Sequence, residues 1–319
     1  MMHVVVTDYT FPDLAQEQAA ATAVGAAFSA HQCQTAAEVT AAVAGADVVV
    51  VQFAPFDAAA AAAVAKGATI IRYGVGYNNI DVSAADAFGL RVGYVPDYCA
   101  DEVADHTAAA ALSMLRKLPM LDASVRAEQW TAVAVAKPLK PFAATNFGFF
   151  GLGQIGRAVL ARLAGFGFQF MAADPSLSPA EAVRIGVTLV DGETLLREAD
   201  IISLHAPATP QTTGYFNAAR LATMRPHAVI VNSARGQLII EDDLAEALTR
   251  GTIGGAALDV FHVEPLSLDN PLLRAPNTLL TPHAAWYSEA AIHKLQALVA
   301  EDIARALRGQ EPRKPVPRG

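Results

Sequence analysis

Short apolar runs and alanine-rich stretches alternate along the first hundred residues of the chain. The runs are rich in valine and isoleucine, and they predict strands at 3–7, 47–53, 68–72 and 91–95. The stretches between them predict helices at 12–22, 35–44, 57–66 and 83–88. Strands that alternate with helices pair in parallel and need cover on both faces, so this part of the chain is expected to form an α/β domain.

The same alternation resumes in the second half of the chain. Further strands are predicted at 168–173, 187–190, 200–205, 228–232, 255–258 and 278–281. Between the two arrays, a long helix is expected over 101–118, with the Asp101 carboxylate as its cap and Pro119 as its breaker. A last helix is expected at 287–307.

A G-x-G-x-x-G loop lies between an apolar, aromatic run at 146–150 and a predicted helix. In such a loop Gly151 permits a tight turn, Gly153 lets the backbone approach a pyrophosphate, and Gly156 lets the helix pack against the strand. The pyrophosphate is then bound by the helix N-terminus. The next apolar run ends at Asp174, whose carboxylate can accept hydrogen bonds from ribose hydroxyls and repels a 2′-phosphate. Glycines also serve ordinary turns, but this whole arrangement predicts a nucleotide-binding unit that prefers NAD to NADP.

Composition narrows the class of protein. The 319 residues exceed one typical domain, so two are expected. A net charge of −8 argues against a nucleic-acid partner, which requires a clustered basic surface. The apolar stretch at 41–65 is interrupted by Asp47, Gln52 and Pro55, so no membrane span and no membrane partner is expected.

The N-terminus reads as a core strand, and it lacks the basic and apolar regions of a signal peptide. Cys33 and Cys99, the two cysteines, form neither a disulfide framework nor a metal pattern. No metal is therefore expected, and a cytoplasmic location is predicted. Each cysteine is best explained as a small buried hydrophobic residue.

The nucleotide fingerprint begins only near residue 146, after a complete β-α array. This order predicts a Rossmann nucleotide-binding domain at 101–286 inserted into a first domain formed by 1–100 and 287–319. Both domains are expected to be doubly wound parallel sheets, and the first is expected to be flavodoxin-like and to bind substrate.

Three later segments place polar side chains at the carboxyl ends of predicted strands, where ligands bind in open α/β sheets. Arg235 follows one strand, and its planar guanidinium can hold a carboxylate through two hydrogen bonds. Asp259 and Glu264 follow the next strand, and His283 follows the last. A surface salt bridge would also explain Arg235, and a lone histidine is often structural. Together, however, an arginine, a carboxylate and a histidine beside a nicotinamide suffice for hydride chemistry.

In these motifs and their order the chain resembles the D-isomer-specific 2-hydroxyacid dehydrogenases over nearly its whole length. The matching segments are 72–81, 102–106, the Gly151 loop with Asp174, and the segments that carry Arg235, Glu264 and His283. Two others, 95–99 and 282–289, resemble the branch that includes the C-terminal-binding-protein corepressors and their bacterial enzyme relatives.

The resemblance implies a role for each matching residue. Arg235 would hold the substrate carboxylate and C2 oxygen, with help from the backbone N–H groups of Val75 and Gly76. His283 would exchange a proton with the C2 oxygen, Glu264 would hydrogen-bond the other imidazole nitrogen, and Asp259 would bind the nicotinamide carboxamide. Further cofactor-lining positions implied by the resemblance are Val75, Thr107, Gln154, Ile155, His205, Ala206, Pro207, Thr212, Ser233, Ala234, His283 and Ala285. Walls of an apolar substrate pocket are expected at Phe53, Phe56, Tyr77, Tyr98 and Trp286, although such aromatics also serve as ordinary packing.

The implied activity is that of an NAD-dependent D-2-hydroxyacid dehydrogenase, which transfers hydride reversibly between NAD(H) and C2 of a small anionic 2-oxo or 2-hydroxy acid. The sequence does not name that acid, and the family leaves a non-carbon substrate such as phosphite open. The alternative is a non-metabolic NAD(H)-sensing scaffold like the corepressors, although those carry extended tails that are not expected here.

A homodimer is also implied by the resemblance. Its interface is expected on the helix that contains the small apolar residues 108–112. The alternative is that this face packs inside its own subunit.

Overall fold

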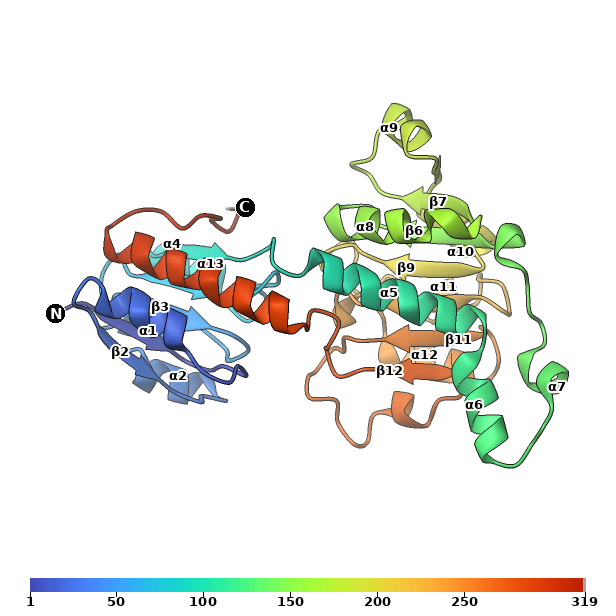
Figure 1. Ribbon diagram of the computed structural model, residues 1–319, viewed down its shortest axis with the longest axis horizontal. Helices are drawn as coiled ribbons and strands as arrows, with labels where there is room; N and C mark the ends of the chain where they lie inside the picture. Colours follow the sequence, from blue (N-terminus) through green and yellow to red (C-terminus); the bar gives the residue numbers. More distant parts are fainter. Residues whose placement is uncertain (318–319) are drawn as a thin grey trace. The chain divides into compact units, whose positions relative to one another are not determined.

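The computed structural model describes residues 1–317, and the chain forms two compact units (Figure 1). The first consists of residues 1–99 and the segment from Tyr287 onward, and the second consists of residues 100–286. The sequence analysis placed the divisions after residues 100 and 286. The α/β class predicted for both parts is confirmed by the sheets and helices described below.

The first unit is a parallel sheet of five strands in the order β2-β1-β3-β4-β5, the flavodoxin-like order. Its strands are β1 His3–Val6, β2 Ala27–Ala30, β3 Val48–Val51, β4 Thr69–Arg72 and β5 Arg91–Tyr94. Its helices are α1 Ala15–Thr22, α2 Ala36–Ala42, α3 Ala58–Ala63, α4 Val82–Ala87 and α13 Glu289–Leu307. The sequence analysis missed β2, because this edge strand is half exposed and contains one large apolar residue, Phe28.

Alternate side chains of these short strands face opposite layers. Val5, Val49 and Ile70 join one core cluster together with apolar residues of α2, α3 and α4. On the other face, α1 and α13 pack against each other, and α13 also contacts β3 and β4. The valine-rich runs are therefore buried on both sides, as the sequence predicted for parallel strands.

The second unit is a parallel sheet of seven strands in the order β12-β11-β10-β9-β6-β7-β8, a Rossmann order with one added strand. Its strands are β6 Asn146–Phe150, β7 Gln169–Ala173, β8 Thr188–Leu189, β9 Ile201–Leu204, β10 Val229–Asn232, β11 Gly255–Leu258 and β12 Thr278–Leu280. Its α-helices are α5 Ala100–Leu115, α6 Leu118–Arg126, α7 Ala132–Ala136, α8 Gln154–Leu163, α9 Pro179–Arg184, α10 Gly192–Glu198, α11 Ala218–Leu221 and α12 Glu241–Thr249. Short 3₁₀ turns occur at η1 Phe142–Ala144, η2 Ala164–Phe166, η3 Gly236–Leu238 and η4 Pro271–Arg274.

The central strand β6 shows how the aromatic run serves both layers of this unit. Phe147 and Phe149 are fully buried and face the layer formed by α5 and α8, whereas Phe150 faces the layer that contains α11 and α12. Figure 1 shows α5 and α8 side by side on one face of the sheet. Gly148 lies on the second face, and a Cβ there would come within 2.7 Å of Leu195, so helix α10 packs directly on the strand backbone.

The helix expected over 101–118 is shorter than predicted and ends at Leu115. Lys117 then adopts a left-handed conformation, and Pro119 lies in the first turn of α6, so this proline begins a helix instead of ending one. Asp101 is likewise not the cap. It lies in the first turn of α5, where its carboxylate pairs with Arg162 of α8 at 2.9 Å.

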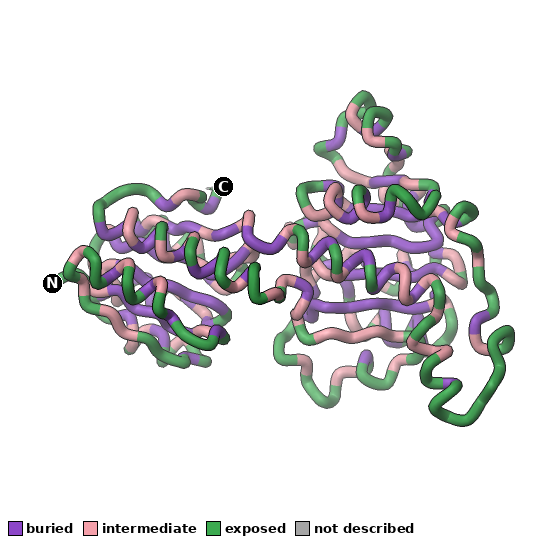
Figure 2. Tube along the Cα trace, viewed as in Figure 1, coloured by how far each residue is buried: buried purple, intermediate pink, exposed green. Residues whose placement is uncertain are grey.

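The small residues proposed for a dimer interface are mostly buried inside their own unit. Ala108 and Ala110 are 7% exposed and Ala111 is 0% exposed, in the core that α5 shares with α8. Several large exposed apolar side chains lie instead on the α6–α7 arm, residues 118–139, which is largely exposed (Figure 2). They are Leu118, Val125, Trp130, Val133 and Leu139.

Candidate active site

Every candidate site residue predicted on a strand of the second unit lies at or just beyond a carboxyl end. The Gly151 loop follows β6, Asp174 follows β7, His205 follows β9 and Arg235 follows β10. Asp259 and Glu264 follow β11, and His283 follows β12. Because all seven strands are parallel, these ends share one edge of the sheet. The direction of the connections reverses at β6, between β9 and β7, which is where ligands bind in such sheets.

The three glycines of the loop differ in what surrounds them. Gly151 has a φ of +85°, and a Cβ there would lie 2.8 Å from the amide nitrogen of Ala206. At Gly156 a Cβ would lie 3.2 Å from the Gly151 carbonyl oxygen, so the start of α8 packs against the loop. At Gly153 a Cβ would meet nothing within 4 Å, and no side chain caps α8. The first turn of α8 can therefore receive an anionic ligand.

Asp174 lies beside this helix N-terminus. Its Oδ2 accepts a hydrogen bond from the Leu152 amide at 2.6 Å, and its Oδ1 accepts bonds from the amide and hydroxyl of Ser176. Partial burial raises the pKa of Asp174, but these hydrogen bonds and the nearby charge of Arg157 outweigh it and lower the pKa overall. The residue is therefore anionic at neutral pH.

His283 and Glu264 form a close pair. The His283 Nδ1 lies 2.6 Å from Glu264 Oε2, and each side chain is about one third exposed. The other carboxylate oxygen, Oε1, accepts a hydrogen bond from the Phe261 amide at 2.9 Å, which orients the carboxylate. Burial raises the pKa of Glu264, but the bonds from His283 and Phe261, with the charge of Arg235, lower it overall. Glu264 is thus an ionised acceptor that selects the Nδ1–H form of the imidazole.

Arg235 is supported by two residues to which the sequence analysis gave no role. The buried side chain of Asn232 donates to the Arg235 carbonyl oxygen at 2.9 Å and accepts from the Ala234 amide at 3.0 Å. A Cβ on Gly236 would lie 2.0 Å from the carbonyl carbon of Phe261, so only glycine permits this approach. The signal was present in the sequence, since a polar Asn ends an otherwise apolar strand just before Arg235 and Gly236.

The side chain of Asp259 is buried and surrounded by hydrogen-bond donors. Its side chain is 2% exposed, and it accepts hydrogen bonds from the Thr281 hydroxyl and from the amides of Ala284 and Ala285. The carboxylate is thus engaged by the segment that carries His283. His106, in the matching segment 102–106, lies 3.3 Å from the Thr281 hydroxyl. These contacts connect α5, β11 and β12.

The remaining cofactor candidates of the second unit vary in exposure. Gln154 is exposed and Ile155 is half-buried at the start of α8, whereas the hydroxyl of Thr107 is buried and without a partner among residues 1–317.

Burial lowers the pKa of His205 to about 4, so this histidine is neutral. In the loop beyond β9, Thr212 donates to the Pro207 carbonyl oxygen at 2.6 Å. The others are Ala206 and Ala285, which are buried, and Ser233 and Ala234, which are half-buried.

The candidates of the first unit follow β3, β4 and β5, with Val75, Gly76 and Tyr77 after β4. These three residues are half-buried, and Tyr77 packs edge-on against Tyr94. Phe56 is 1% exposed within a hydrophobic cluster, so its assignment to a pocket wall is wrong and its role is packing. Tyr98 is also buried, at 7%, whereas Phe53 is 45% exposed. Trp286, in the second unit, is half-buried.

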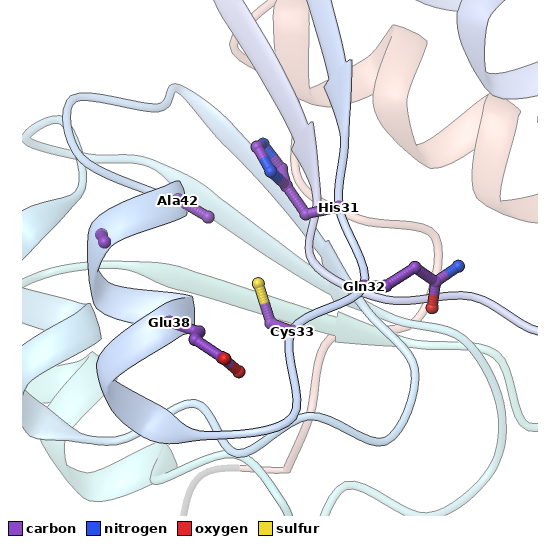
Figure 3. Close-up of a pocket in the computed structure, with 6 residues that line it drawn as sticks. His31, Gln32, Cys33, Glu38 and Ala42 are labelled. Carbon is purple, nitrogen blue, oxygen red and sulfur yellow. The ribbon is translucent and has the colours of Figure 1, made fainter.

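A shallow depression in the first unit lies between the segment after β2 and helix α2 (Figure 3). It is lined by His31, Gln32, Cys33, Glu38, Ala41 and Ala42. Burial and the charges of Glu38 and Asp8 raise the pKa of the Cys33 thiol, which makes it a poor nucleophile. Nowhere in the described part of the chain do three potential metal-binding side chains cluster, and no helix there is long and apolar enough to cross a membrane.

Fold and geometry together define a two-unit α/β protein with a dinucleotide-binding loop and a histidine–carboxylate pair at the same sheet edge. Comparison with known proteins agrees with this class. The family described as "D-isomer specific 2-hydroxyacid dehydrogenase, NAD binding domain" matches residues 108–285, more than half of the chain. The chain therefore belongs to the D-isomer specific 2-hydroxyacid dehydrogenases and contains their NAD-binding domain.

Individual relatives support the family assignment. The chain is 39% identical over 254 residues to D-3-phosphoglycerate dehydrogenase of Mycobacterium bovis, which covers 80% of this chain and 48% of the relative. It is 34% identical over 260 residues to glyoxylate reductase of Korarchaeum cryptofilum, and this match covers 81% of the present chain and 78% of the relative. The crystal structure of TT0316 protein from Thermus thermophilus superposes with a TM-score of 0.86 at 32% identity. The superposition covers 99% of the present chain and 100% of the TT0316 chain. The chain spans about half the length of the phosphoglycerate dehydrogenases that it matches.

Proposed function

We propose that this chain is an NAD-dependent D-2-hydroxyacid dehydrogenase that interconverts a 2-oxo acid and the D-2-hydroxy acid. The observation that carries the proposal is the 2.6 Å contact between His283 Nδ1 and Glu264 Oε2, at the edge of the sheet where the dinucleotide loop lies. A histidine held by an ionised carboxylate is suited to proton transfer, and the family supplies the class of reaction.

The residues of the second unit fit NAD. The open space at Gly153 and the uncapped first turn of α8 suit a pyrophosphate. The anionic Asp174 suits ribose hydroxyls and opposes a 2′-phosphate. When bound, NADH supplies the hydride that reduces C2 of the oxo acid.

The protein side of the reaction is assigned to three groups. Arg235 binds the substrate carboxylate and C2 oxygen. Because Nδ1 is the nitrogen held by Glu264, proton transfer to the C2 oxygen is assigned to His283 Nε2. In the oxidation direction the same nitrogen accepts the proton from the hydroxyl group. Tyr77 and Trp286 are proposed as substrate contacts.

Turnover tests the proposal. NADH oxidation would be followed with 2-oxo acids that carry small, apolar or phosphorylated side chains, and NAD reduction with D- and L-2-hydroxy acids and with phosphite. We expect reduction of at least one 2-oxo acid and selectivity for the D-hydroxy acid, both lost in His283→Ala. Tight NADH binding without turnover above the His283→Ala background would instead support the scaffold function.

We further propose a homodimer, now based on the exposed apolar side chains of the α6–α7 arm. Trp130 is 90% exposed and Val133 is 77% exposed, and Leu118, Val125 and Leu139 of the same arm are exposed as well. Several exposed apolar residues on one arm are typical of an interaction surface. Replacing Trp130 and Val133 with polar residues, Trp130→Gln with Val133→Thr, is expected to shift a dimeric mass toward the monomer by light scattering. The matched control is Val183→Thr, at a residue that is 80% exposed on α9. A monomeric mass of the unmodified protein at micromolar concentration contradicts the dimer.

A further inference from the structure

We propose that Asp259, Thr281 and His106 form a positioning network that sets the conformation of the His283 loop, residues 281–285, and so directs His283 toward Glu264. The three residues come from different elements, since Asp259 follows β11, Thr281 follows β12 and His106 lies on α5. The inference rests on the proposed function only because it takes His283 as the proton-transfer group.

Asp259 holds three successive amides of the His283 loop. Its backbone carbonyl accepts from the His283 amide at 2.8 Å. Its carboxylate Oδ1 accepts from the Ala284 amide at 2.8 Å, and Oδ2 accepts from the Ala285 amide at 2.9 Å. Two consecutive N–H groups, those of Ala284 and Ala285, converge on the carboxylate and form a concave nest. The loop is therefore folded around Asp259.

This folding explains the unusual backbone of His283. Its φ is +52°, in the left-handed region that residues other than glycine rarely occupy. Such a conformation persists only where its surroundings over-determine it, and the bonds to Asp259 provide that constraint. In this conformation the imidazole Nδ1 lies 2.6 Å from Glu264. The geometry of the proton-transfer pair thus depends on Asp259, which acts through the backbone of the loop.

Thr281 completes the network through its hydroxyl group. The hydroxyl has one proton, and it donates that proton to Asp259 Oδ1 at 2.6 Å, because a carboxylate can only accept. The contact of 3.3 Å between the same hydroxyl oxygen and His106 Nε2 must therefore have His106 as the donor. His106 Nε2 also lies 3.8 Å from Asp259 Oδ1. Asp259 Oδ1 thus accepts hydrogen bonds from the Thr281 hydroxyl and the Ala284 amide, and the His106 ring lies beside it.

The hydrogen bonds of Asp259 give it a structural role in addition to the cofactor contact that the family resemblance implies. With 2% of its surface exposed and both oxygens engaged, its carboxylate is part of the loop's internal structure. A residue that acts through His283 changes turnover, whereas a residue that contacts the cofactor changes cofactor affinity. Thr281 distinguishes the two, because its hydroxyl is engaged by Asp259 and His106.

The test compares Thr281→Val, which removes the hydroxyl at similar shape, with Thr281→Ser, which retains it. Two quantities would be measured: steady-state kcat and KM with one good 2-oxo acid, and hydrogen exchange of the amides of residues 283–285 in the free protein. In Thr281→Val we expect kcat to fall by about tenfold or more, since a small misplacement of a reacting group can cost about 100-fold. Exchange of the three amides should be faster by about tenfold, the worth of one hydrogen bond to a charged group. KM and the NADH dissociation constant should change less than about threefold, and Thr281→Ser should recover most of kcat.

Thr278→Val is the matched control, because the Thr278 hydroxyl donates to the Ala275 carbonyl at the start of the same strand, away from the Asp259 network. It should leave kcat and the exchange of residues 283–285 unchanged. His106→Leu should shift both quantities in the same direction as Thr281→Val, whereas His106→Gln, which keeps a side-chain N–H donor, should remain near the unmodified protein.

The proposal is overturned if Thr281→Val leaves both kcat and amide exchange unchanged, or if it weakens NADH binding in place of kcat. It is also overturned if Thr281→Ser fails to recover kcat while folding normally. Hydrogen exchange needs no substrate, so it tests the network even if no 2-oxo acid is turned over. Failure of the network and failure of the proposed activity are therefore distinguishable.

Discussion

Glu264 illustrates how much of this site depends on the surroundings of single side chains. Burial alone would favour its neutral form, yet its contacts with His283 and with the Phe261 amide hold the pKa below its usual range. The same contacts determine which imidazole nitrogen carries a proton. Asp174 behaves similarly, because hydrogen bonds from Leu152 and Ser176 overcome its partial burial. In both cases the local hydrogen bonds decide the charge.

Glu264→Gln is expected to lower kcat/KM by about 10- to 150-fold, the worth of a hydrogen bond to a charged group of about 1.5–3 kcal/mol. The amide keeps the shape of the side chain but cannot stabilise an imidazolium as a carboxylate does.

His283→Ala should lower kcat/KM further, by about 10²- to 10⁴-fold, because the proton donor itself is removed. Arg235→Lys should weaken substrate binding and turnover together, since an ammonium group cannot form the bidentate contact. Steady-state kinetics with one good 2-oxo acid measure all three, and an unchanged kcat/KM in Glu264→Gln would remove Glu264 from the mechanism.

Asp174→Ala should narrow the preference for NADH over NADPH by on the order of tenfold or more, because a charge that repels the 2′-phosphate is removed. The ratio of kcat/KM for the two cofactors measures this preference. Ser176→Ala is the control: it removes one donor to Asp174 but keeps the carboxylate, so the ratio should change little. Equal efficiency with both cofactors in the unmodified protein would refute the role assigned to Asp174.

Among the elements, the β6–α8 unit carries the most specific local structure. Strand β6 is buried on both faces, its turn needs a positive φ at Gly151, and α8 begins without a side-chain cap. Because no side chain caps α8, the backbone N–H groups of its first turn are available to an anion. The first two glycines of the turn thus have separable tasks, one in folding and one in binding.

Gly151→Ala and Gly153→Ala should separate these tasks. A methyl group at Gly151 would meet the backbone of Ala206 at 2.8 Å with φ at +85°, so the free energy of unfolding should fall by about 1–3 kcal/mol. A methyl group at Gly153 meets no protein atom within 4 Å, and the backbone there has a φ of −73° that alanine adopts readily. That variant should fold normally but bind NADH about 5- to 150-fold more weakly, because the methyl occupies space for the pyrophosphate at a cost of about 1–3 kcal/mol. Denaturant titration and NADH binding measure the two effects, and unchanged NADH binding in Gly153→Ala would contradict the assignment.

On the scale of the whole molecule, stability of the second unit depends on the sheet edge opposite the site. Asp200, which precedes β9, is 2% exposed, and its Oδ1 contacts Lys140, Arg225 and His227 at 2.6–2.8 Å. Its Oδ2 accepts from the Asn146 amide at the start of β6. Burial raises the pKa of Asp200, but these four donors outweigh it and hold the pKa well below its usual range.

Stability should therefore depend on Asp200 in a defined pH range. Since the folded pKa is lower than the unfolded value of 3.8, the unfolded chain binds more protons in acid. The contribution of Asp200 is then fully present above about pH 4 to 5 and is lost as the pH falls below that range. At neutral pH, Asp200→Asn should lower the free energy of unfolding by about 1.5–3 kcal/mol, the worth of a hydrogen bond to a charged group, because the partly exposed Lys140 and Arg225 lose their anion.

Urea unfolding over a pH series measures this difference. Asp122→Asn is the control, since Asp122 pairs with Arg126 on the exposed surface and should contribute less than about 1 kcal/mol. A difference between the unmodified protein and Asp200→Asn that stays constant down to pH 3 would contradict the assignment.

The order of strands and helices, the glycine loop and the polar residues that end the strands are properties of the sequence alone. Apolar runs with a period of two or a continuous apolar character predict strands, and parallel strands bring their carboxyl ends to one edge. For this reason the sequence alone predicts that Arg235, Glu264 and His283 lie together. The edge strand β2 escaped prediction because a half-exposed run with one large apolar residue has little pattern to detect.

Only the tertiary structure decided which partner each side chain takes. Periodicity predicts which face a residue occupies but not what covers that face, so the alanines of α5 were assigned to another subunit although α8 buries them. For the same reason Phe56 was assigned to a pocket although it packs in the core. His106 and Thr281 are 175 positions apart in the chain, and their contact requires α5 and the end of β12 to meet. Contacts of this kind depend on how distant segments pack, and the free energy that selects them is distributed over the whole core.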